Sequence, residues 1–368
     1  MTSPGLVRVH RWVALSLGVL VVLMGLTGAA LVFRDELTAV LTPAVKISTS
    51  PAAAGEYQRI FAAARRLEPG VGSMDIVPFG AGRATQVILY RTGHERYLFV
   101  DPHDGAVVAD SNREWLPFAV LFQLHRRFML GEAGGYAVGI TGFALAFMAI
   151  SGLVLWWPRK LKYALRIRWD GNRLAVSYDL HRCAGALFAL LLIVNAVIGI
   201  TMTFDDASVA LVNRLSGNPA PVLPAASSSI LSSARPLDEI VAAAERALPG
   251  GSVTRIAIRD GDAPVVVRKR LGNENDTHGG NRVYVDAASA AVLRVNTLAS
   301  LPPGNSMFEW SYPLHTGTLV GTPYRILLVF AGLVPLLSFV TGLIVWRSKA
   351  KKREKTPVPL GATLPTSR

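Results

Sequence analysis

The chain has 368 residues, of which 51% are hydrophobic, and it carries a formal net charge of +13. This composition excludes an ordinary soluble domain and fits a membrane protein with substantial soluble parts. One cysteine, Cys183, excludes a disulfide framework, and we expect it to be a small packed side chain. The positive charge lies mostly beside apolar runs, which favours membrane orientation over nucleic-acid binding.

Four apolar runs are long enough to cross a hydrocarbon core of ~30 Å, which takes about 20 helical residues. They lie at 11–33, 136–157, 180–204 and 324–346. Segments 1–11, 158–173 and 347–368 hold 15 basic and two acidic residues, which is the whole net charge. Because Lys and Arg concentrate in cytoplasmic segments beside spans, we expect these segments in the cytoplasm. Residues 34–135 and 205–322 are then expected outside.

The first half begins with a span over residues 1–34. Small residues at 28–30 raise the alternative of a cleaved signal peptide, but the apolar run continues to Phe33, so we expect a retained helix. Residues 35–114 are expected to form a small α+β domain. Its helix is predicted over Glu56–Leu67 by an apolar stripe, and its strands over Val87–Tyr90 and from Tyr97 into a tight turn at Gly105.

The stretch from Leu124 to Trp157 is too long for one straight span at ~1.5 Å per residue. We therefore predict a break near Gly131, with an interfacial helix within 115–135, starting near Trp115, and a second span over 136–157. A basic cytoplasmic loop over 158–179 and a third span over 180–204 follow.

The second half repeats this order. Residues 205–305 contain a Pro/Ala/Ser-rich linker (217–235), a predicted helix at Pro236–Leu248, and predicted strands at Val265–Val267 and Val283–Val285. The turn after the last strand, Ala287–Ser289, lacks the glycine of its counterpart. An interfacial segment (306–322), a fourth span (323–346) and a basic cytoplasmic tail (347–368) complete the chain.

Direct comparison of the halves supports a tandem duplication. At an offset of 171 residues, one set of positions is identical without a gap: His10/His181, Arg11/Arg182, Leu20/Leu191, Gly28/Gly199 and Phe33/Phe204. At an offset of 190, a second set is identical: Leu124/Leu314, His125/His315, Gly131/Gly321, Gly142/Gly332, Gly152/Gly342, Leu153/Leu343 and Trp156/Trp346. Both halves run in the same direction, which indicates a pseudo-two-fold axis along the membrane normal.

The duplication places histidines at matching depths. His10 and His181 are expected at the cytoplasmic ends of spans one and three, and His125 and His315 on the two interfacial segments. A pseudo-two-fold would bring each pair face to face, as two axial imidazoles of a haem b iron require. No CxxCH motif is present, so the haem would be held without a covalent bond.

Zinc is the competing metal, but two histidines per level without suitably spaced Cys, Asp or Glu fit it poorly. The remaining histidines, His94, His103 and His278, are expected to be solvated loop residues. Three of the four histidines are followed directly by arginine: Arg11, Arg182, and Arg126 with Arg127. A guanidinium at such a position can hold a haem propionate, or it can anchor the helix at the membrane interface. The repeated glycines allow either approach of a flat ring or close helix packing. Trp156, Trp157 and Trp346 read as aromatic-belt residues.

Together these residues resemble the PepSY-associated transmembrane family of iron-regulated inner-membrane proteins, which includes ferric-siderophore reductases. The resemblance covers about residues 6–348. Its specific parts are the four Leu/Val-His starts, the span ends Ser151–Pro158 and Thr341–Leu343, and the strand and turn from Tyr97 to Gly105. It implies a membrane all-α core of four transmembrane helices built from two tandem repeats, with two small periplasmic α+β PepSY-like domains.

The resemblance also implies a bacterial inner-membrane protein with two haems b, ligated by His10, His181, His125 and His315, that reduces ferric siderophore and releases Fe(II). No GxGxxG fingerprint is present, so we expect electrons from a separate donor, a flavoprotein or quinol. Membrane lipid is the other expected partner. Two alternatives stay open: a membrane-anchored PepSY binding or regulatory protein without redox activity, and a haem or siderophore transporter.

Overall fold

The structure is a computed structural model that describes residues 4–41, 55–80, 82–91, 94–111, 117–157, 163–218, 224–227, 235–272, 274 and 278–354. It divides into two compact units, which the chain enters alternately. Unit 1 comprises residues 1–26, 141–196 and 330–368, and unit 2 comprises residues 27–140 and 197–329. Some predicted segments lie in part outside the described residues: the cytoplasmic loop (158–162), the linker (219–223 and 228–234), the tail (355–368) and Trp115.

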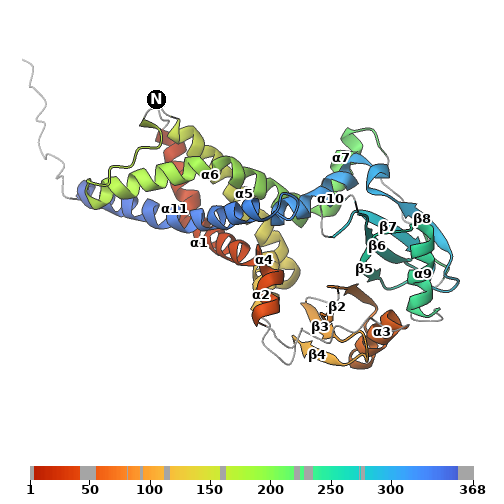
Figure 1. Ribbon diagram of the computed structural model, residues 1–368. Coiled ribbons are helices and arrows are strands. Elements are labelled where there is room, and N and C mark those ends of the chain that lie inside the picture. The colour runs from red at the N-terminus through yellow and green to blue at the C-terminus, as the bar shows by residue number, and fades with distance from the viewer. Residues whose placement is uncertain are drawn as a thin grey trace, which may run out of the picture. The chain divides into compact units, whose positions relative to one another are not determined.

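The four predicted spans are helices of membrane-crossing length and hydropathy. They are α1 (Pro4–Leu31), α5 (Gly131–Trp156), α6 (Arg173–Thr203) and α11 (Thr322–Glu354), and Figure 1 labels each of them. α6 and α11 extend beyond the apolar runs, because a helix continues into the interface where hydropathy has already fallen. Asn172 sets the start of α6, since its side-chain oxygen accepts a hydrogen bond from the Ala175 N–H at 3.0 Å, as an N-cap does.

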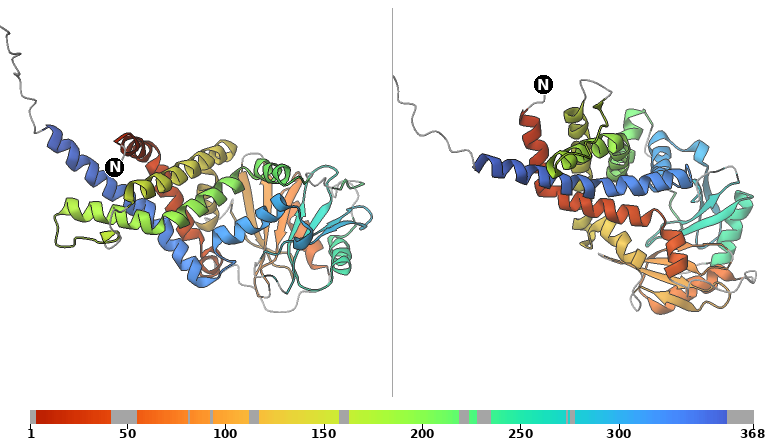
Figure 2. Two further views of the ribbon diagram at one scale, coloured as in Figure 1. Left: turned by 90° about the horizontal axis from the view of Figure 1, so that it is seen from above. Right: turned by 60° about the vertical axis from the view of Figure 1, so that its left-hand side comes forward.

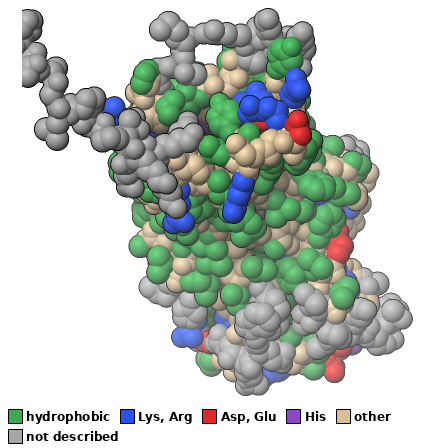
Figure 3. Space-filling view, turned by 90° about the vertical axis from the view of Figure 1, so that its left-hand side faces the viewer, with side chains coloured by type: hydrophobic (Ala, Val, Ile, Leu, Met, Phe, Trp, Pro, Cys, Tyr) green, Lys and Arg blue, Asp and Glu red, His purple; other side chains and the backbone are tan. Residues whose placement is uncertain are grey.

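Unit 1 holds its helices together through small residues and a modest apolar cluster. Gly25 of α1 lies so close to α11 that an added Cβ would stand 2.4 Å from the Gly332 carbonyl oxygen. Leu192, Ala331 and Val334 form the buried cluster between α6 and α11. Large apolar side chains such as Leu187 and Leu190 face outward. Figure 3, which views the side toward which the ends of α6 and α11 point in Figure 1, shows apolar side chains over much of this face and a group of Lys and Arg near its top.

Unit 2 contains one antiparallel sheet of eight strands in the order β4-β3-β2-β1-β5-β6-β7-β8. The strands are β1 (Ser73–Val77), β2 (Thr85–Arg91), β3 (His94–Val100), β4 (Val107–Asp110), β5 (Ser252–Ile258), β6 (Val265–Arg270), β7 (Asn281–Val285) and β8 (Val292–Asn296). Helices α3 (Glu56–Leu67) and α9 (Leu237–Ala247) cover one face of it (Figure 2). Both helices agree with the predicted ones to within a residue.

The described part of unit 2 also contains five short helical elements. They are α2 (Arg34–Leu41), α4 (Pro117–Arg127), α7 (Asp205–Leu215), the 3₁₀ turn η3 (Leu298–Ser300) and α10 (Pro303–Thr316). α4 and α10 are the two predicted interfacial segments. Positive φ angles at Phe128, Met129 and Gly131 make the break between α4 and α5. Gly317 and Gly321, also at positive φ, make the equivalent break before α11.

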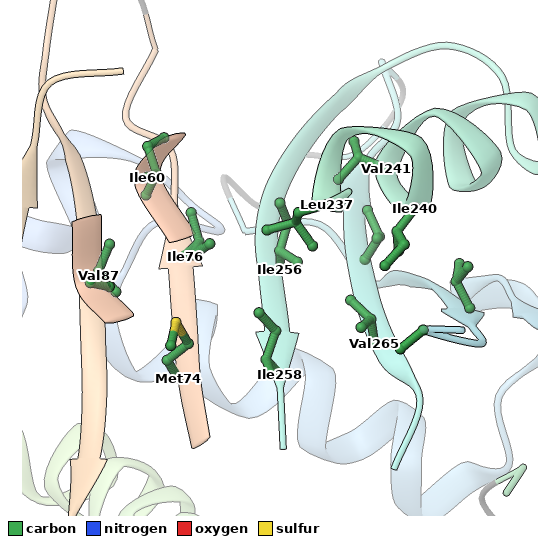
Figure 4. Packing of buried hydrophobic residues seen from close by; sticks show 14 of the residues in the cluster. Ile60, Met74, Ile76, Val87, Leu237, Ile240, Val241, Ile256, Ile258 and Val265 are labelled. Atoms are coloured by element: carbon green, nitrogen blue, oxygen red, sulfur yellow. The ribbon is translucent and has the colours of Figure 1, made fainter. Parts of the chain in front are cut away.

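The two expected α+β domains are joined through β1 and β5, which the sequence did not mark as strands. Met74 pairs with Ile258 and Ile76 with Ile256 across this seam, and Figure 4 shows these four side chains in one core. On the opposite face, buried Asp75 forms ion pairs with Arg255 at 3.3 Å and Arg259 at 2.7 Å. Each half therefore keeps its own helix and four strands, but both share a single sheet and core.

The covering helices also cap each other. The Asp238 carboxylate of α9 accepts hydrogen bonds from the backbone N–H groups of Tyr57 (3.2 Å) and Gln58 (2.9 Å) at the start of α3. The Gln58 side chain in turn accepts one from the Leu237 N–H at 2.8 Å. These bonds satisfy N–H groups that a helix start leaves unpaired.

The turn without a glycine is nevertheless retained. In the first half, the Gly105 N–H donates to the Asp101 carbonyl at 2.9 Å, and Gly105 has a φ of +74°. In the second half, the Ala290 N–H donates to the Asp286 carbonyl at 2.9 Å, and Ala290 has a φ of +58°. The same turn therefore forms with an alanine in the left-handed region, where an L-residue with a Cβ is strained.

Candidate cofactor sites

The first histidine pair lies within unit 1. His10 of α1 and His181 of α6 have ring centroids 6.4 Å apart, with the ring planes near perpendicular at 85°. The Nδ1 atom of His10 is 2.8 Å from the Ser151 hydroxyl of α5, and the Nδ1 atom of His181 is 2.9 Å from the Ser338 carbonyl oxygen of α11. All four membrane-length helices thus contribute to this site.

These hydrogen bonds determine which nitrogen of each ring carries the proton. A carbonyl oxygen can only accept, so His181 must donate from Nδ1 to Ser338. The Ser151 hydroxyl donates its own hydrogen to the Phe147 carbonyl at 2.6 Å, so it accepts from the His10 Nδ1–H. In a neutral imidazole, the other nitrogen is then unprotonated. Both rings therefore hold the Nε2 lone pair that a metal requires.

The second pair lies within unit 2. His125 of α4 and His315 of α10 have ring centroids 6.2 Å apart, with the planes inclined at 46°. The Thr27 hydroxyl is 3.0 Å from the His125 Nδ1. Burial lowers the pKa of His315 to about 4, which keeps this imidazole neutral at physiological pH. Its Nδ1 is shielded from solvent and has no hydrogen-bond partner among the described residues.

Each ring faces a glycine of a neighbouring helix. A Cβ added at Gly152 would stand 3.6 Å from the His10 Cε1, and one at Gly342 would stand 3.2 Å from the His181 Cε1. At the second pair, the corresponding distances are 3.0 Å from Gly28 to His125 and 3.8 Å from Gly199 to His315. Four of the repeated glycines, Gly28, Gly152, Gly199 and Gly342, therefore make room for the imidazoles. Gly332 instead lies at the close contact with Gly25, as the close-packing alternative predicts.

The pair spacing fits one metal ion between two imidazoles. A metal–imidazole bond of about 2 Å, plus roughly 1.1 Å from that nitrogen to the ring centre, places two trans rings about 6.2 Å apart centre to centre. The observed separations are 6.4 and 6.2 Å. Within the described residues, no group of three or more His, Cys, Asp or Glu side chains comes together as a metal site. The donor set of each site is two imidazoles, which suits a haem iron.

The four predicted propionate-binding arginines have different surroundings. Arg11 and Arg182 each have an Nε that is buried without a partner among the described residues. Arg182 also donates to the Arg166 carbonyl at 3.0 Å. Arg126 pairs with Glu95 at 2.7 Å, and Arg127 lies 3.9 Å from the same carboxylate. Binding of a propionate stays a prediction for all four, and the first two have the unpaired donors that it would use.

A buried glutamate anchors each helix of the second pair to its half of the sheet, which the sequence analysis missed. Glu95 of β3, with 3% of its side chain exposed, pairs with Arg126 of α4, next to His125. In the other half, Glu309 of α10 is equally buried and pairs with Arg268 of β6 and Arg282 of β7. In the first half the glutamate is on the strand and the arginine on the helix, whereas in the second half the glutamate is on the helix and the arginines are on strands. Alignment of the two halves therefore could not reveal this correspondence.

The remaining candidates lie apart from the pairs. His278 was expected in solvent but is half-buried, with its ring centroid 4.7 Å from that of Tyr312. The His103 N–H donates to the Asp101 side chain in the turn, and the side chain of His94 lies outside the described ones. Cys183 is a buried free thiol, as predicted.

Four membrane-length helices and a sheet unit, with two pairs of histidines, define a multi-pass membrane protein with two candidate cofactor sites. The family is shown by comparison with known families: the chain belongs to the PepSY-associated TM region family, whose model matches residues 7–349. No curated protein matches the chain.

Proposed function

We propose that this protein is a di-haem b electron-transfer protein of the bacterial inner membrane that reduces ferric siderophore outside the cytoplasm. The observation that carries the proposal is the geometry of the two histidine pairs, at 6.4 and 6.2 Å between ring centres. His10 and His181 would ligate one haem iron, and His125 and His315 the other. When bound, a bis-histidine haem b supplies one-electron transfer.

The surrounding residues do the work of positioning. Ser151 and Ser338 fix the ring orientation and tautomer of the His10–His181 pair, and Thr27 orients His125. The ion pairs of Glu95 and Glu309 hold α4 and α10 to the sheet, and this fixes the distance between His125 and His315. Arg11 and Arg182 would neutralise the propionates of a haem held at the first pair.

The basic segments support the direction of transfer. Residues 1–11 and 158–173 hold eight Lys/Arg and one acidic residue, and they adjoin His10 and the start of α6. The positive-inside bias puts this end in the cytoplasm, where a separate flavoprotein or quinol would donate electrons. The sheet unit and the His125–His315 pair would lie in the periplasm, toward the siderophore. Reduction to Fe(II) weakens binding by hard oxygen chelators, so the metal is released.

The test is the haem content of the purified full chain after expression with added haem. Pyridine haemochrome and reduced-minus-oxidised spectra are expected to give two b-type haems per chain. His125→Ala and His10→Ala are each expected to leave one, whereas the control His103→Ala keeps both. Addition of a ferric hydroxamate siderophore to the reduced protein should reoxidise it and produce Fe(II).

Other outcomes favour the alternatives. A colourless protein after expression with adequate haem would overturn the redox proposal and favour a PepSY binding or regulatory protein. Two haems in His125→Ala would overturn the pairing. Siderophore uptake without reoxidation of the haem would favour a transporter.

A further inference from the structure

Three of the four histidines share one supporting arrangement. The glycine that faces the ring is preceded by a hydroxyl residue, whose oxygen lies near Nδ1. Ser151 precedes Gly152 and is 2.8 Å from the His10 Nδ1. Thr27 precedes Gly28 and is 3.0 Å from the His125 Nδ1. Thr341 precedes Gly342 and is 3.3 Å from the His181 Nδ1, which also contacts the Ser338 carbonyl.

The fourth arrangement lacks the hydroxyl. Gly199 faces His315 as Gly28 faces His125, but the residue before it is Ile198, at the offset of 171 that matches Thr27. An isoleucine side chain cannot accept a hydrogen bond. His315 is also the histidine whose shielded Nδ1 has no partner among the described residues. We therefore attribute the missing hydrogen bond of the His315 Nδ1 to the presence of Ile198 where the first half has Thr27.

We propose that Ile198 is a positioning residue that makes His315 the weakest of the four ligands and gives the His125–His315 site the higher reduction potential. This inference rests on the proposed haem ligation. An Nδ1–H that donates to an acceptor makes the imidazole a more basic ligand, which favours ferric over ferrous iron. Ser151 and the Ser338 carbonyl accept from His10 and His181, and the Thr27 hydroxyl lies 3.0 Å from the His125 Nδ1, where it can accept when Nε2 binds iron. The His315 Nδ1 has no such neighbour among the described residues. One-electron transfer from the His10–His181 site to the His125–His315 site is then downhill.

The decisive variant is Ile198→Thr, which restores the Thr-Gly pair found on α1 and α11. The new hydroxyl can donate to the carbonyl four residues earlier, as Thr341 does to Leu337 at 2.6 Å, and accept from His315. Ile198→Val is the matched control, because it keeps a β-branched apolar side chain. Thr27→Val is the converse variant, since it removes the hydroxyl that lies 3.0 Å from the His125 Nδ1.

The measurements use the full haem-loaded chain in a His10→Ala background, where only the His125–His315 site would hold haem. Ile198→Thr is expected to lower the midpoint potential through a preference for ferric iron about tenfold stronger, or about 59 mV for one electron. Carbon monoxide, which must displace one axial ligand of the reduced haem, is expected to bind about tenfold more weakly. Thr27→Val should raise the potential, and Ile198→Val should leave both readings unchanged.

The outcomes separate the two proposals. Absence of haem from the unsubstituted chain overturns the proposed function, and this inference with it. One haem in the His10→Ala background, with equal potentials and carbon monoxide affinities for Ile198→Thr and Ile198→Val, overturns only the role of Ile198. A raised potential in Thr27→Val with no change in Ile198→Thr also overturns it, because the hydroxyl would then matter at His125 alone.

Discussion

Replacement of Glu309 by glutamine tests the anchor that holds α10, six residues before His315. Both carboxylate oxygens of Glu309 accept hydrogen bonds, one from Arg268 and one from Arg282. The glutamine amide keeps one acceptor but turns an N–H₂ group toward the second guanidinium. Arg268 and Arg282 then both lose the negative charge of the Glu309 carboxylate.

The magnitude follows from burial. Loss of one partner from a fully buried ion pair costs about 3–5 kcal/mol, because a desolvated charge remains. Here the glutamate side chain is 3% exposed and the arginine side chains are 18% and 24% exposed, so water partly solvates them. We therefore expect a loss of about 2–4 kcal/mol in the stability of unit 2. In a unit of this size, that loss lowers Tm by roughly 4–16 °C.

The assay is thermal unfolding of the detergent-solubilised chain, followed by circular dichroism. The matched control is Glu239→Gln, whose partner Arg235 and own side chain are 57% and 50% exposed. An exposed pair of this kind contributes less than about 0.5 kcal/mol, so the control should unfold as the unsubstituted chain does. Replacement of Glu309, Arg268 and Arg282 together by apolar residues should recover most of the loss. Equal melting temperatures for the Glu309 and Glu239 variants would refute the anchor.

Three further predictions concern the sheet unit. Asp238→Ala removes the acceptor that caps α3 and should cost about 1–2 kcal/mol in unfolding free energy, whereas exposed Glu245→Ala should not. Ala290→Gly should raise the unfolding free energy by about 0.5–1 kcal/mol in denaturant titration, because glycine adopts a positive φ without strain. Gly105→Ala should lower the unfolding free energy for the same reason. A lower stability in the first variant or a higher one in the second would contradict the strain argument. Burial raises the pKa of Asp286, but hydrogen bonds from Ser227 and Ser289 outweigh it and hold this pKa well below its usual range. Its contribution is therefore present above about pH 4 and lost as the pH falls further, so Asp286→Asn should flatten acid unfolding there; an unchanged acid limb would contradict this.

Local sequence patterns predicted the elements that depend on local composition. The four spans follow from apolar length, and α3 and α9 from apolar stripes, because neither property needs a distant partner. The repeat went further and predicted which histidines meet. Both pairs come together, with ring centroids 6.4 and 6.2 Å apart, as the matched spacing of the two halves predicts.

Strand pairing at the seam was beyond the sequence. β1 and β5 have few features that mark them as strands, and Asp75 lies at the centre of one of them. Its charge is tolerated because Arg255 and Arg259, about 180 residues away in the chain, lie beside it. A buried strand can contain a charged residue when the fold brings oppositely charged side chains beside it. Local sequence does not show these partners, so the pairing of β1 with β5, which joins the two expected domains into one sheet, was not predicted.

The sequence by itself therefore determined the four membrane-length helices and the matched spacing of the four histidines, because these are properties of composition and spacing. Only the tertiary structure decided what each histidine contacts: a serine hydroxyl, a carbonyl oxygen, a threonine, or no acceptor for the Nδ1 of His315. It also decided that Glu95 and Glu309 form the ion pairs that hold α4 and α10 to the sheet, with the carboxylate on the strand in the first half and on the helix in the second. Hydrogen bonds and ion pairs join atoms that are distant in the chain, and their geometry exists only once the helices and strands have packed.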